Sequence, residues 1–361
     1  MTAAAPADVR FAREGRLGVV TLDRQAALNA LTRDMVRAVS RQLLDWRDDP
    51  AVAAVLVKAA PGRAFCAGGD IRSVHDAVRE GRVAEAVAFF RDEYRLNWRV
   101  RRYPKPYVAL LDGIVMGGGV GISVHGSHRV VTEDTLFAMP ETGIGFFPDV
   151  GATYFLPGCP GEVGTYLGLT GERLHAADCL HAGIGTAYVP ASGLAALEDA
   201  LSALPADADH ADVDDVLARF ATAPNGEPPL AGQRDLIDRC FAADGVPEIA
   251  ERLRGTGEAG GRVLATLAAK SPLSLHVTLA QLRRGRALAF EDAMRLELRL
   301  ASRFMEGSDF LEGVRALLVD KDKRPRWRHP DLASVPAAEV EALLGPPPEG
   351  VADLELDWQG A

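Results

Sequence analysis

The sequence predicts an α/β fold with a core of parallel strands. Short apolar runs of strand length, at residues 51–57 and 107–111, alternate with longer segments whose apolar residues recur at helical spacing. Continuous apolar runs indicate strands buried on both faces, which is typical of parallel sheets covered by helices. With 361 residues, 48% hydrophobic and 25% charged, the chain can bury a sizeable core in one large or two ordinary domains.

The N-terminal part predicts a hairpin followed by a helix. Residues 9–14 and 17–22 are strand-like and are separated only by Gly15 and Arg16. Thr32 is a suitable N-cap for the helix. Its buried face is predicted from apolar residues at helical spacing: Met35, Val36, Val39, Leu43 and Trp46.

A strand, a helical region and a second strand come next. The strand at 51–57 ends before Pro61-Gly62, and one helical region is expected from residue 71 to about residue 102. Pro104 and Pro106 end that region ahead of the buried strand at 107–111.

The second half of the chain is expected to be mainly helical, with one short strand at 186–189. Clusters of Ala, Asp and Pro make 203–230 the expected connector. Only helices are predicted from 231 to 318, and the end of the chain from about Pro346 is expected to be loosely tethered. The predicted organisation is therefore a core at 1–202, a connector at 203–230 and a helical C-terminal region at 231–361.

The charge and the cysteines restrict the class of protein. A formal charge of -10 and a pI near 5.4 argue against nucleic acid or an anionic membrane as a partner, although a local basic pocket stays possible. The cysteines form no C-x-x-C pair, so neither a disulfide scaffold nor a structural zinc is indicated. No export signal or long apolar run is evident, and a soluble protein of the reducing cytoplasm is expected.

Two glycine-rich turns follow buried strands, at residues 66–70 and 116–121. In open α/β sheets ligands bind beyond the carboxyl ends of the strands. One backbone N–H from each turn could therefore converge on a single carbonyl oxygen and stabilise an oxyanion. The alternative is that the glycines only permit tight packing.

The spacing of the glycines and histidines does not match other known functional motifs. Gly113 and Gly118 are followed by Gly119 where a phosphate-binding P-loop needs lysine, and no G-x-G-x-x-G begins at Gly117, Gly119 or Gly143. The run from Gly121 to His125 lacks the second glycine of a nucleophile elbow. His125 and His128 have no metal-ligand spacing, so no metal site is expected.

Two carboxylates in the same stretch are candidates for chemistry. Glu141 has apolar neighbours, and burial would raise its pKa and make it a better base or nucleophile near neutral pH. Its alternative is a solvated surface glutamate. Asp149 follows Pro148 at an apparent helix start, where an aspartate is usually a cap.

The sequence resembles the crotonase (enoyl-CoA hydratase/isomerase) superfamily and, within it, the 3-hydroxyisobutyryl-CoA hydrolase branch. Ordered segments along nearly the whole chain carry the resemblance: VVTLDRQAALNALT, GRAFCAGGDIRS, YPKPYVALLDGIVMGGGVGIS, FAMPETGIGFFPDVGATYFLPG, LTGERLHAADCLHAGIGTAYVP, KSPLSLHVTLAQL and DFLEGVRALLVDKDKRPRW. The resemblance implies a spiral of β-β-α units. It also implies a helical C-terminal region that completes the active site or mediates trimer contacts.

The family's site residues can be placed on this sequence one by one. Its two oxyanion-hole N–H groups correspond to Gly69 and Gly118. Hydratases carry a catalytic glutamate two residues after their glycine triplet, where this chain has Gly121. Their second glutamate corresponds to Glu141. The hydrolase branch resembles this chain in keeping that residue and in having an aspartate at the position of Asp149.

The resemblance implies hydrolysis of an acyl-CoA thioester, most closely 3-hydroxyisobutyryl-CoA in valine breakdown. Glu141 would act either as a general base on water or as a nucleophile that forms an anhydride. Asp149 would bind the substrate hydroxyl or orient Glu141 and the water. The alternatives are a hydratase or isomerase of the same superfamily, and a non-catalytic acyl-CoA-binding protein.

Coenzyme A enters as part of the substrate, and no separate cofactor is implied. Its phosphates need local positive charge, although Gln25 and Ala26 stand where the family usually has proline and lysine. The oligomer is expected to be trimer-based or a monomer. The candidate CoA-binding residues are Arg24, Ala27, Leu28, Arg63, Ala67, Gly68, Asp70 and Lys270.

Overall fold

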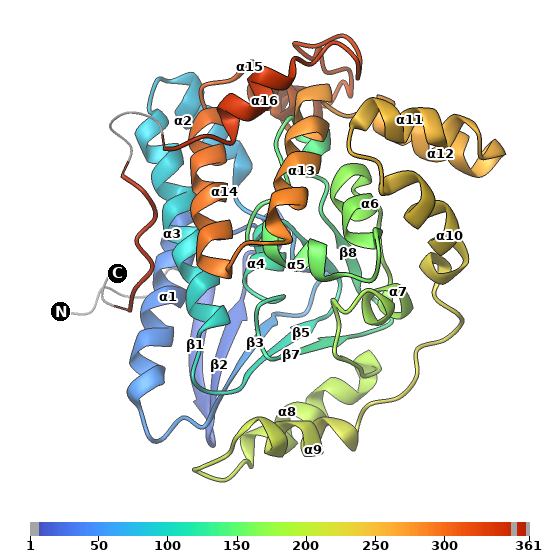
Figure 1. The fold of residues 1–361 in the computed structure, drawn as a ribbon. Coiled ribbons are helices and arrows are strands. Elements are labelled where there is room, and N and C mark those ends of the chain that lie inside the picture. The colour runs from blue at the N-terminus through green and yellow to red at the C-terminus, as the bar shows by residue number, and fades with distance from the viewer. Residues whose placement is uncertain (1–6, 348–351, 359–361) are drawn as a thin grey trace.

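A six-stranded sheet forms the base of the core in the computed structural model, which describes residues 7–347 and 352–358 (Figure 1). The first two strands pair antiparallel and confirm the predicted hairpin, whereas the later ones run parallel. In spatial order the strands are β1 (Val9–Glu14), β2 (Leu17–Leu22), β3 (Ala54–Ala59), β5 (Tyr107–Leu111), β7 (His128–Val131) and β9 (Ala187–Tyr188).

A smaller parallel sheet stands beyond the ends of these strands. It consists of β4 (Ala64–Cys66), β6 (Ile114–Met116) and β8 (Leu136–Ala138). Along the chain β3, β5 and β7 of the large sheet are each followed by one strand of the small sheet. The chain therefore winds as a spiral in which each turn contributes a strand to both sheets, and the expected β-β-α spiral is confirmed.

Helices α1 (Arg33–Asp48) and α3 (Val83–Arg101) cover one face of the large sheet, and α2 (Ile71–Arg79) packs against α3 beyond the sheet (Figure 1). Thr32 caps α1 as predicted, because its side chain accepts a hydrogen bond from the Met35 N–H at 3.2 Å. The helical region expected over 71–102 consists of two helices. Gly81, with φ of 77°, adopts the left-handed conformation that ends α2, and α3 begins two residues later.

The other face is covered by α8 (Leu194–Ser202) and α9 (His210–Ala218). Leu197 and Val213 of these helices pack against Leu56 and Val108, whose side chains point away from the α1 face. Residues 203–230 were expected to be only a connector, but α9 lies within them and contributes to this second core layer. The division into domains stays a prediction.

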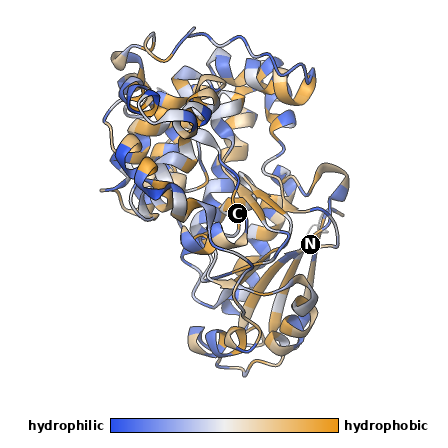
Figure 2. Cartoon of the chain, turned by 90° about the vertical axis from the view of Figure 1, so that its right-hand side faces the viewer, coloured by the Kyte–Doolittle hydropathy of each residue, from blue (hydrophilic) through white to orange (hydrophobic). Residues whose placement is uncertain are grey.

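The C-terminal region is helical, as predicted, and packs mainly against α3, α5 (Ala152–Phe155) and α6 (Val163–Thr170). No single helix among the described residues is long and apolar enough to cross a membrane, and only one pair, bent by 108° between α12 and α13, passes such a test jointly. The central strands are mostly hydrophobic, whereas these helices have mixed faces (Figure 2). They are α10 (Pro229–Phe241), α11 (Val246–Arg254), α12 (Gly257–Ala268), α13 (Pro272–Gly285), α14 (Phe290–Phe304), α15 (Ser308–Val314) and α16 (Ala337–Leu343).

The described end of the chain, residues 352–358, is docked rather than loosely tethered. Leu354 is buried, and the Trp358 ring lies 5.1 Å from that of Trp98 on α3. The Arg91 and Arg95 side chains of α3 donate hydrogen bonds to backbone carbonyls of this segment. The expectation for this part of the chain was therefore wrong, because periodicity does not reveal a chain end that packs in an extended form.

Candidate active site

The two glycine turns meet at the same edge of the small sheet. The first follows β4 and the second follows β6, and these strands are parallel neighbours. Gly68 and Gly117 have φ angles of 127° and 46°, which favour glycine and let the backbones approach closely. A Cβ placed on Gly117 would lie 3.3 Å from the Gly68 Cα.

The N–H groups of Gly69 and Gly118 are available to a ligand. A Cβ on Gly118 would lie 3.1 Å from the Gly69 nitrogen, so the two groups are close together. Gly118 is the first residue of α4 (Gly118–Gly121), where a helix leaves its N–H groups unpaired. Within residues 7–347 and 352–358 neither N–H donates a hydrogen bond to the protein. The pair is suited to a carbonyl oxygen that becomes negative.

Glu141 lies beside these turns and is buried, which excludes the solvated-surface alternative. It begins a short 3-10 helix (Glu141–Ile144) after β8, and a Cβ on Gly117 would lie 3.4 Å from its Oε1. Its Oε2 is buried and has no hydrogen-bond partner among the described residues. Burial, and next the Asp149 charge, raise the pKa of Glu141 well above its usual value.

Asp149 is also buried, and it is not a helix cap. The helix that follows, α5 (Ala152–Phe155), starts after Gly151 and has no side-chain cap. The Tyr94 hydroxyl instead donates a hydrogen bond to Asp149 Oδ2 at 2.7 Å. Burial raises the pKa of Asp149 to about 7, although the Tyr94 bond opposes this shift.

A third carboxyl group, that of Glu93 on α3, was not predicted from the sequence. A Cβ on Gly118 would overlap its Oε1, which is buried without a partner among the described residues. Burial, and then the charges of Asp149 and Glu141, raise the pKa of Glu93. The sequence did contain one signal for Glu93. It stands between Phe90 and Tyr94, which are two positions of the predicted apolar helix face.

Gly121, the position at which hydratases carry their other glutamate, has no room for a side chain in this protein. A Cβ on Gly121 would lie 2.6 Å from Asn97 Nδ2 and 2.8 Å from Val150 Cβ. Even the first carbon of a side chain would require α3 or the Asp149 loop to shift. Gly121 is therefore a packing position and leaves no room for a carboxylate.

The candidate CoA-binding residues divide into two groups in the structure. The segment with Ala27 and Leu28 pairs with the first glycine turn, since the Ala67 N–H donates to the Leu28 carbonyl at 3.0 Å. Arg24 lies there too, but its guanidinium is bound to Asp70 at 2.9 Å and to the Ala30 carbonyl. Asp70 also caps α2, which accounts for it structurally.

Lys270 and Arg63 occupy different places. Lys270 lies near Glu141, since its charge lowers the pKa of Glu141 and its Nζ lies 3.4 Å from the Cβ position of Gly143. Burial lowers the pKa of Lys270 itself. Arg63 is exposed at the start of β4, at the opposite end of that strand from the first glycine turn, and forms no ion pair within the described part of the chain. The CoA-binding roles of all eight residues stay predictions.

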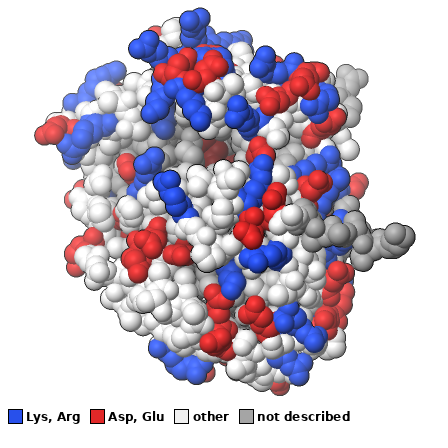
Figure 3. All heavy atoms as spheres, turned by 180° about the vertical axis from the view of Figure 1, so that it is seen from behind, with Lys and Arg blue, Asp and Glu red and all other residues white. Residues whose placement is uncertain are grey.

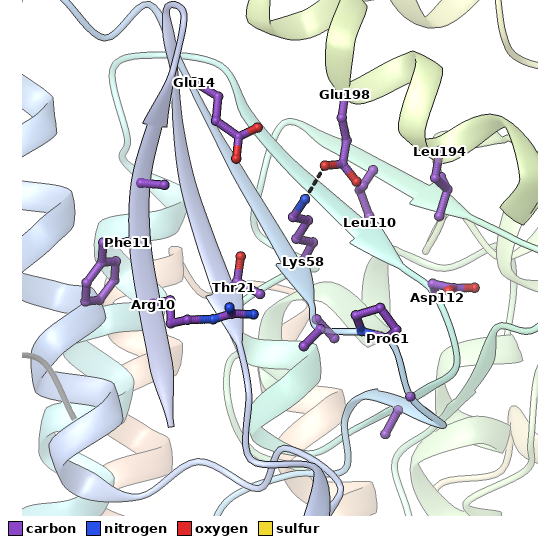
Figure 4. Close-up of a pocket in the computed structure, with 15 residues that line it drawn as sticks. Arg10, Phe11, Glu14, Thr21, Lys58, Pro61, Leu110, Asp112, Leu194 and Glu198 are labelled. Atoms are coloured by element: carbon purple, nitrogen blue, oxygen red, sulfur yellow. Dashed lines mark hydrogen bonds and ion pairs between the residues drawn. The ribbon is translucent and has the colours of Figure 1, made fainter. Parts of the chain in front are cut away.

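A large pocket of about 560 Å³ lies elsewhere, on the α8 face of the large sheet (Figure 4). Thr21, Lys58 and Leu110 line it, and Lys58 forms an ion pair with Glu198 of α8. None of the glycine turns or buried carboxyl groups described above borders it. This pocket is therefore separate from the candidate active site.

Curated relatives share nearly the whole chain. It is 45% identical over 339 residues to the mitochondrial 3-hydroxyisobutyryl-CoA hydrolase of Danio rerio, covering 93% of this chain and 88% of that protein. For the Homo sapiens protein of the same name the identity is 44% over 333 residues, covering 91% and 86%. These relatives are named mitochondrial, which overturns the expectation of a cytoplasmic location.

Solved structures agree on the fold and carry different names. A carnitinyl-CoA dehydratase from Mycobacterium thermoresistibile superposes with a TM-score of 0.90 at 41% identity, covering 99% of this chain and all of that one. An enoyl-CoA hydratase from Rhodobacter sphaeroides superposes with a TM-score of 0.87 at 41% identity, covering 97% and 100%. The sequence also matches the model of the family described as enoyl-CoA hydratase/isomerase over residues 17–344. The chain belongs to that family, the crotonase superfamily.

Proposed function

We propose that this protein hydrolyses an acyl-CoA thioester, with 3-hydroxyisobutyryl-CoA as the substrate and valine breakdown as its context. One observation carries the proposal: Glu141, whose buried Oε2 has no partner among the described residues, lies beside two N–H groups that donate to no described residue, while the position of the hydratases' other glutamate, Gly121, has no room for a side chain. Relatives at 44–45% identity carry the name of this hydrolase.

The oxyanion hole acts first. The thioester carbonyl oxygen accepts hydrogen bonds from the Gly69 and Gly118 N–H groups, which strengthen as the oxygen becomes negative. Loss of one such donor typically costs about 10²–10³ in rate. The two donors come from backbone held by neighbouring strands, so little reorganisation accompanies the reaction.

Glu141 supplies the base or the nucleophile. Its raised pKa makes the carboxylate a strong proton acceptor near neutral pH. In one route it takes a proton from the water that attacks the carbonyl carbon. In the other it attacks that carbon, the C–S bond breaks, and water opens the resulting anhydride. Both routes release the CoA thiol and a free acid.

Polar groups beside Glu141 favour a hydroxylated acyl group. Glu93 presents a buried oxygen without a partner among the described residues, and Asp149 has one oxygen bound by Tyr94. A buried acceptor without a partner carries a free-energy cost that a substrate hydroxyl would remove. These two carboxyl groups are therefore proposed to bind the 3-hydroxyl.

The CoA phosphates need positive charge on an otherwise acidic protein. Figure 3 shows a hollow with acidic atoms on its floor and several Lys and Arg side chains around its rim. Such a rim supplies local positive potential without changing the net charge. Arg63, exposed and without an ion-pair partner among the described residues, is one candidate, and it lies at the start of β4, the strand that leads into the first glycine turn.

Hydration of an enoyl-CoA is a second candidate, because Glu93 brings another carboxyl group to the site from α3. The two solved relatives are named a dehydratase and a hydratase. Hydration needs two groups that add the elements of water across a double bond, and Glu93 with Glu141 offers such a pair. The two reactions have different products and can be separated directly.

A thiol-release assay separates the candidates. 3-Hydroxyisobutyryl-, 3-hydroxypropionyl-, acetyl- and crotonyl-CoA are each incubated with the enzyme and a thiol reagent. All four cysteines are buried, so the protein gives little background. We expect fastest release from 3-hydroxyisobutyryl-CoA. Rapid loss of the enoyl absorbance of crotonyl-CoA without free thiol would support hydration instead. Binding of CoA esters without any turnover would support a non-catalytic protein.

Glu141→Gln tests the central residue. We expect thiol release to fall by at least about 10³ because the amide is neither base nor nucleophile. CoA binding, measured by calorimetry, is expected to persist because the substitution affects only the acyl end. Equal turnover by the variant and the wild type would contradict the assignment.

A further inference from the structure

The loop that carries Asp149 has a strained backbone. Val150 has a φ of 52° and Gly151 a φ of 91°, so two consecutive residues are left-handed. A β-branched residue rarely adopts this conformation, and it persists only where the surroundings hold it. The groups that hold this loop are therefore of interest for the position of the Asp149 carboxylate.

Buried polar side chains from three elements bind the loop backbone. Gln281 on α13 donates to the Pro148 carbonyl at 2.5 Å, and the His125 ring bonds the Val150 carbonyl at 2.7 Å. Glu297 on α14 binds the other end of the turn. Its two oxygens accept hydrogen bonds from the N–H groups of Gly151, at 2.7 Å, and Thr153, at 2.9 Å.

Among these side chains, Glu297 is the one whose burial most needs a physical explanation. It is fully buried and forms no ion pair with any residue in the described ranges. Burial of a carboxylate without a countercharge is unfavourable, and its compensation here is two charge-assisted hydrogen bonds to backbone. A packing role alone would be filled better by an apolar side chain of similar size.

We propose that Glu297 is a positioning residue for Asp149. Because it accepts hydrogen bonds from the N–H groups of Gly151 and Thr153, it fixes the backbone that follows Asp149, while the Tyr94 hydroxyl fixes the Asp149 carboxylate itself. This role rests on the proposed hydrolase function and extends it to a helix of the C-terminal region. Since Glu297 is 148 residues from Asp149 in the sequence, α14 completes the active site from outside the spiral.

The pH profile offers a readout that a purely structural role would not change. The carboxyl groups of Glu93, Glu141 and Glu297 surround Asp149 together with the Tyr94 hydroxyl, and Lys270 faces Glu141. Each ionised carboxylate makes the next proton harder to remove. Burial raises the pKa of Glu297 to about 8, and its charge, once ionised, raises the pKa of Glu141. Glu297→Gln therefore lowers the pKa of Glu141 and shifts the acid limb that Glu141 sets in kcat/KM to lower pH.

Glu297→Gln tests the proposal, and Glu291→Gln is its matched control. Glu291 lies on the same helix and binds Trp98 and Arg102 of α3, away from the loop. For Glu297→Gln we expect kcat to fall at least tenfold, KM to change less than threefold and the acid limb to shift. For Glu291→Gln we expect kcat within twofold of the wild type. If both variants lose thermal stability equally and keep kcat and the pH profile, the proposal is wrong.

Hydrogen–deuterium exchange tests, without any turnover, whether Glu297 holds the N–H groups of Gly151 and Thr153; we call this pair of hydrogen bonds the clamp. We expect peptides that contain Gly151 and Thr153 to exchange faster in Glu297→Gln and at the wild-type rate in Glu291→Gln. Unchanged exchange would overturn the clamp even if the enzyme is a hydrolase. Conversely, a wild type that releases no thiol would contradict the proposed function, and exchange would still report on the clamp. If Glu297→Gln does not fold, Gln281→Met removes a second loop contact and is expected to give the same kinetic pattern.

Discussion

Asp149 combines a proposed catalytic role with a cost to the stability of the folded protein. Its pKa is raised from 3.8 to about 7 by burial, so the folded state holds its proton more tightly than the unfolded state. The resulting stabilisation is fully present below the unfolded pKa and is lost as pH rises through about 7. The group therefore destabilises the native protein at the pH where the proposed reaction needs its charge, a trade-off typical of active sites.

Asp149→Asn should separate the two effects. The asparagine oxygen can still accept the Tyr94 hydrogen bond, but the side chain carries no charge. We expect a large fall in kcat at every pH. We also expect a gain in stability at pH 8 of at most about 4 kcal/mol, which disappears toward pH 4. Thermal melts across this range measure the difference.

Asp235→Asn, at an exposed position on α10, is the control for loss of one negative charge. Its melting temperature should follow the wild type at each pH. If Asp149→Asn is less stable than the wild type at pH 8, burial of the charge is not the main influence on stability at this position. A loss of stability without loss of kcat would instead identify Asp149 as a structural residue.

At single positions the sequence identified the residues with local signals. Gly118 and Glu141 stand in a glycine-rich stretch and an apolar stretch that are unusual by themselves. Glu93, Tyr94 and Glu297 lie within helices, where one polar residue on an apolar face has little local signal. They join the site only because α3 and α14 pack against the Asp149 loop, and no spacing along the chain encodes that contact.

The strand-turn units are the elements that create the oxyanion hole. Because β4 and β6 are adjacent and parallel, their carboxyl ends bring both glycine turns together. The sequence predicted the turns and their place after buried strands, and resemblance to the family assigned their roles. It did not predict that α3 packs against them, because the helical region expected at 71–102 carries no signal of what it contacts.

Gly118→Ala tests this arrangement. The new Cβ would overlap Glu93 Oε1 and approach the Gly69 nitrogen to 3.1 Å, so it must displace a carboxyl group or widen the hole. We expect kcat to fall by about 10² in the thiol-release assay, comparable to the loss of one oxyanion donor. Gly158→Ala, where a Cβ would contact nothing within 4 Å, serves as the control and should keep full activity. Equal rates for the two variants would contradict the placement of the oxyanion hole at Gly118.

In the whole molecule, the end of the chain returns to the helix that carries Glu93 and Tyr94. Residues 352–358 lie along α3, where Arg299 of α14 forms an ion pair with Asp353. The Arg47 guanidinium of α1 stacks over Trp358 at 5.0 Å. The segment thus links α1, α3 and α14 across the outside of the site. Sequence periodicity could not predict this link, because an extended segment has no helical face.

Leu354→Ala measures how much this link stabilises the protein. The Leu354 side chain is only 2% exposed, so its truncation removes buried apolar surface and leaves a cavity, which typically costs about 2–4 kcal/mol. Leu318→Ala is the control, because that side chain is 39% exposed and its loss should cost less than about 0.5 kcal/mol. Urea unfolding monitored by tryptophan fluorescence gives both values, since Trp98 and Trp358 report on the contact itself. Equal midpoints for the two variants would mean that the segment is held weakly, as its sequence suggests. A selective loss in Leu354→Ala would mean that the chain end helps to hold α3 above the active site.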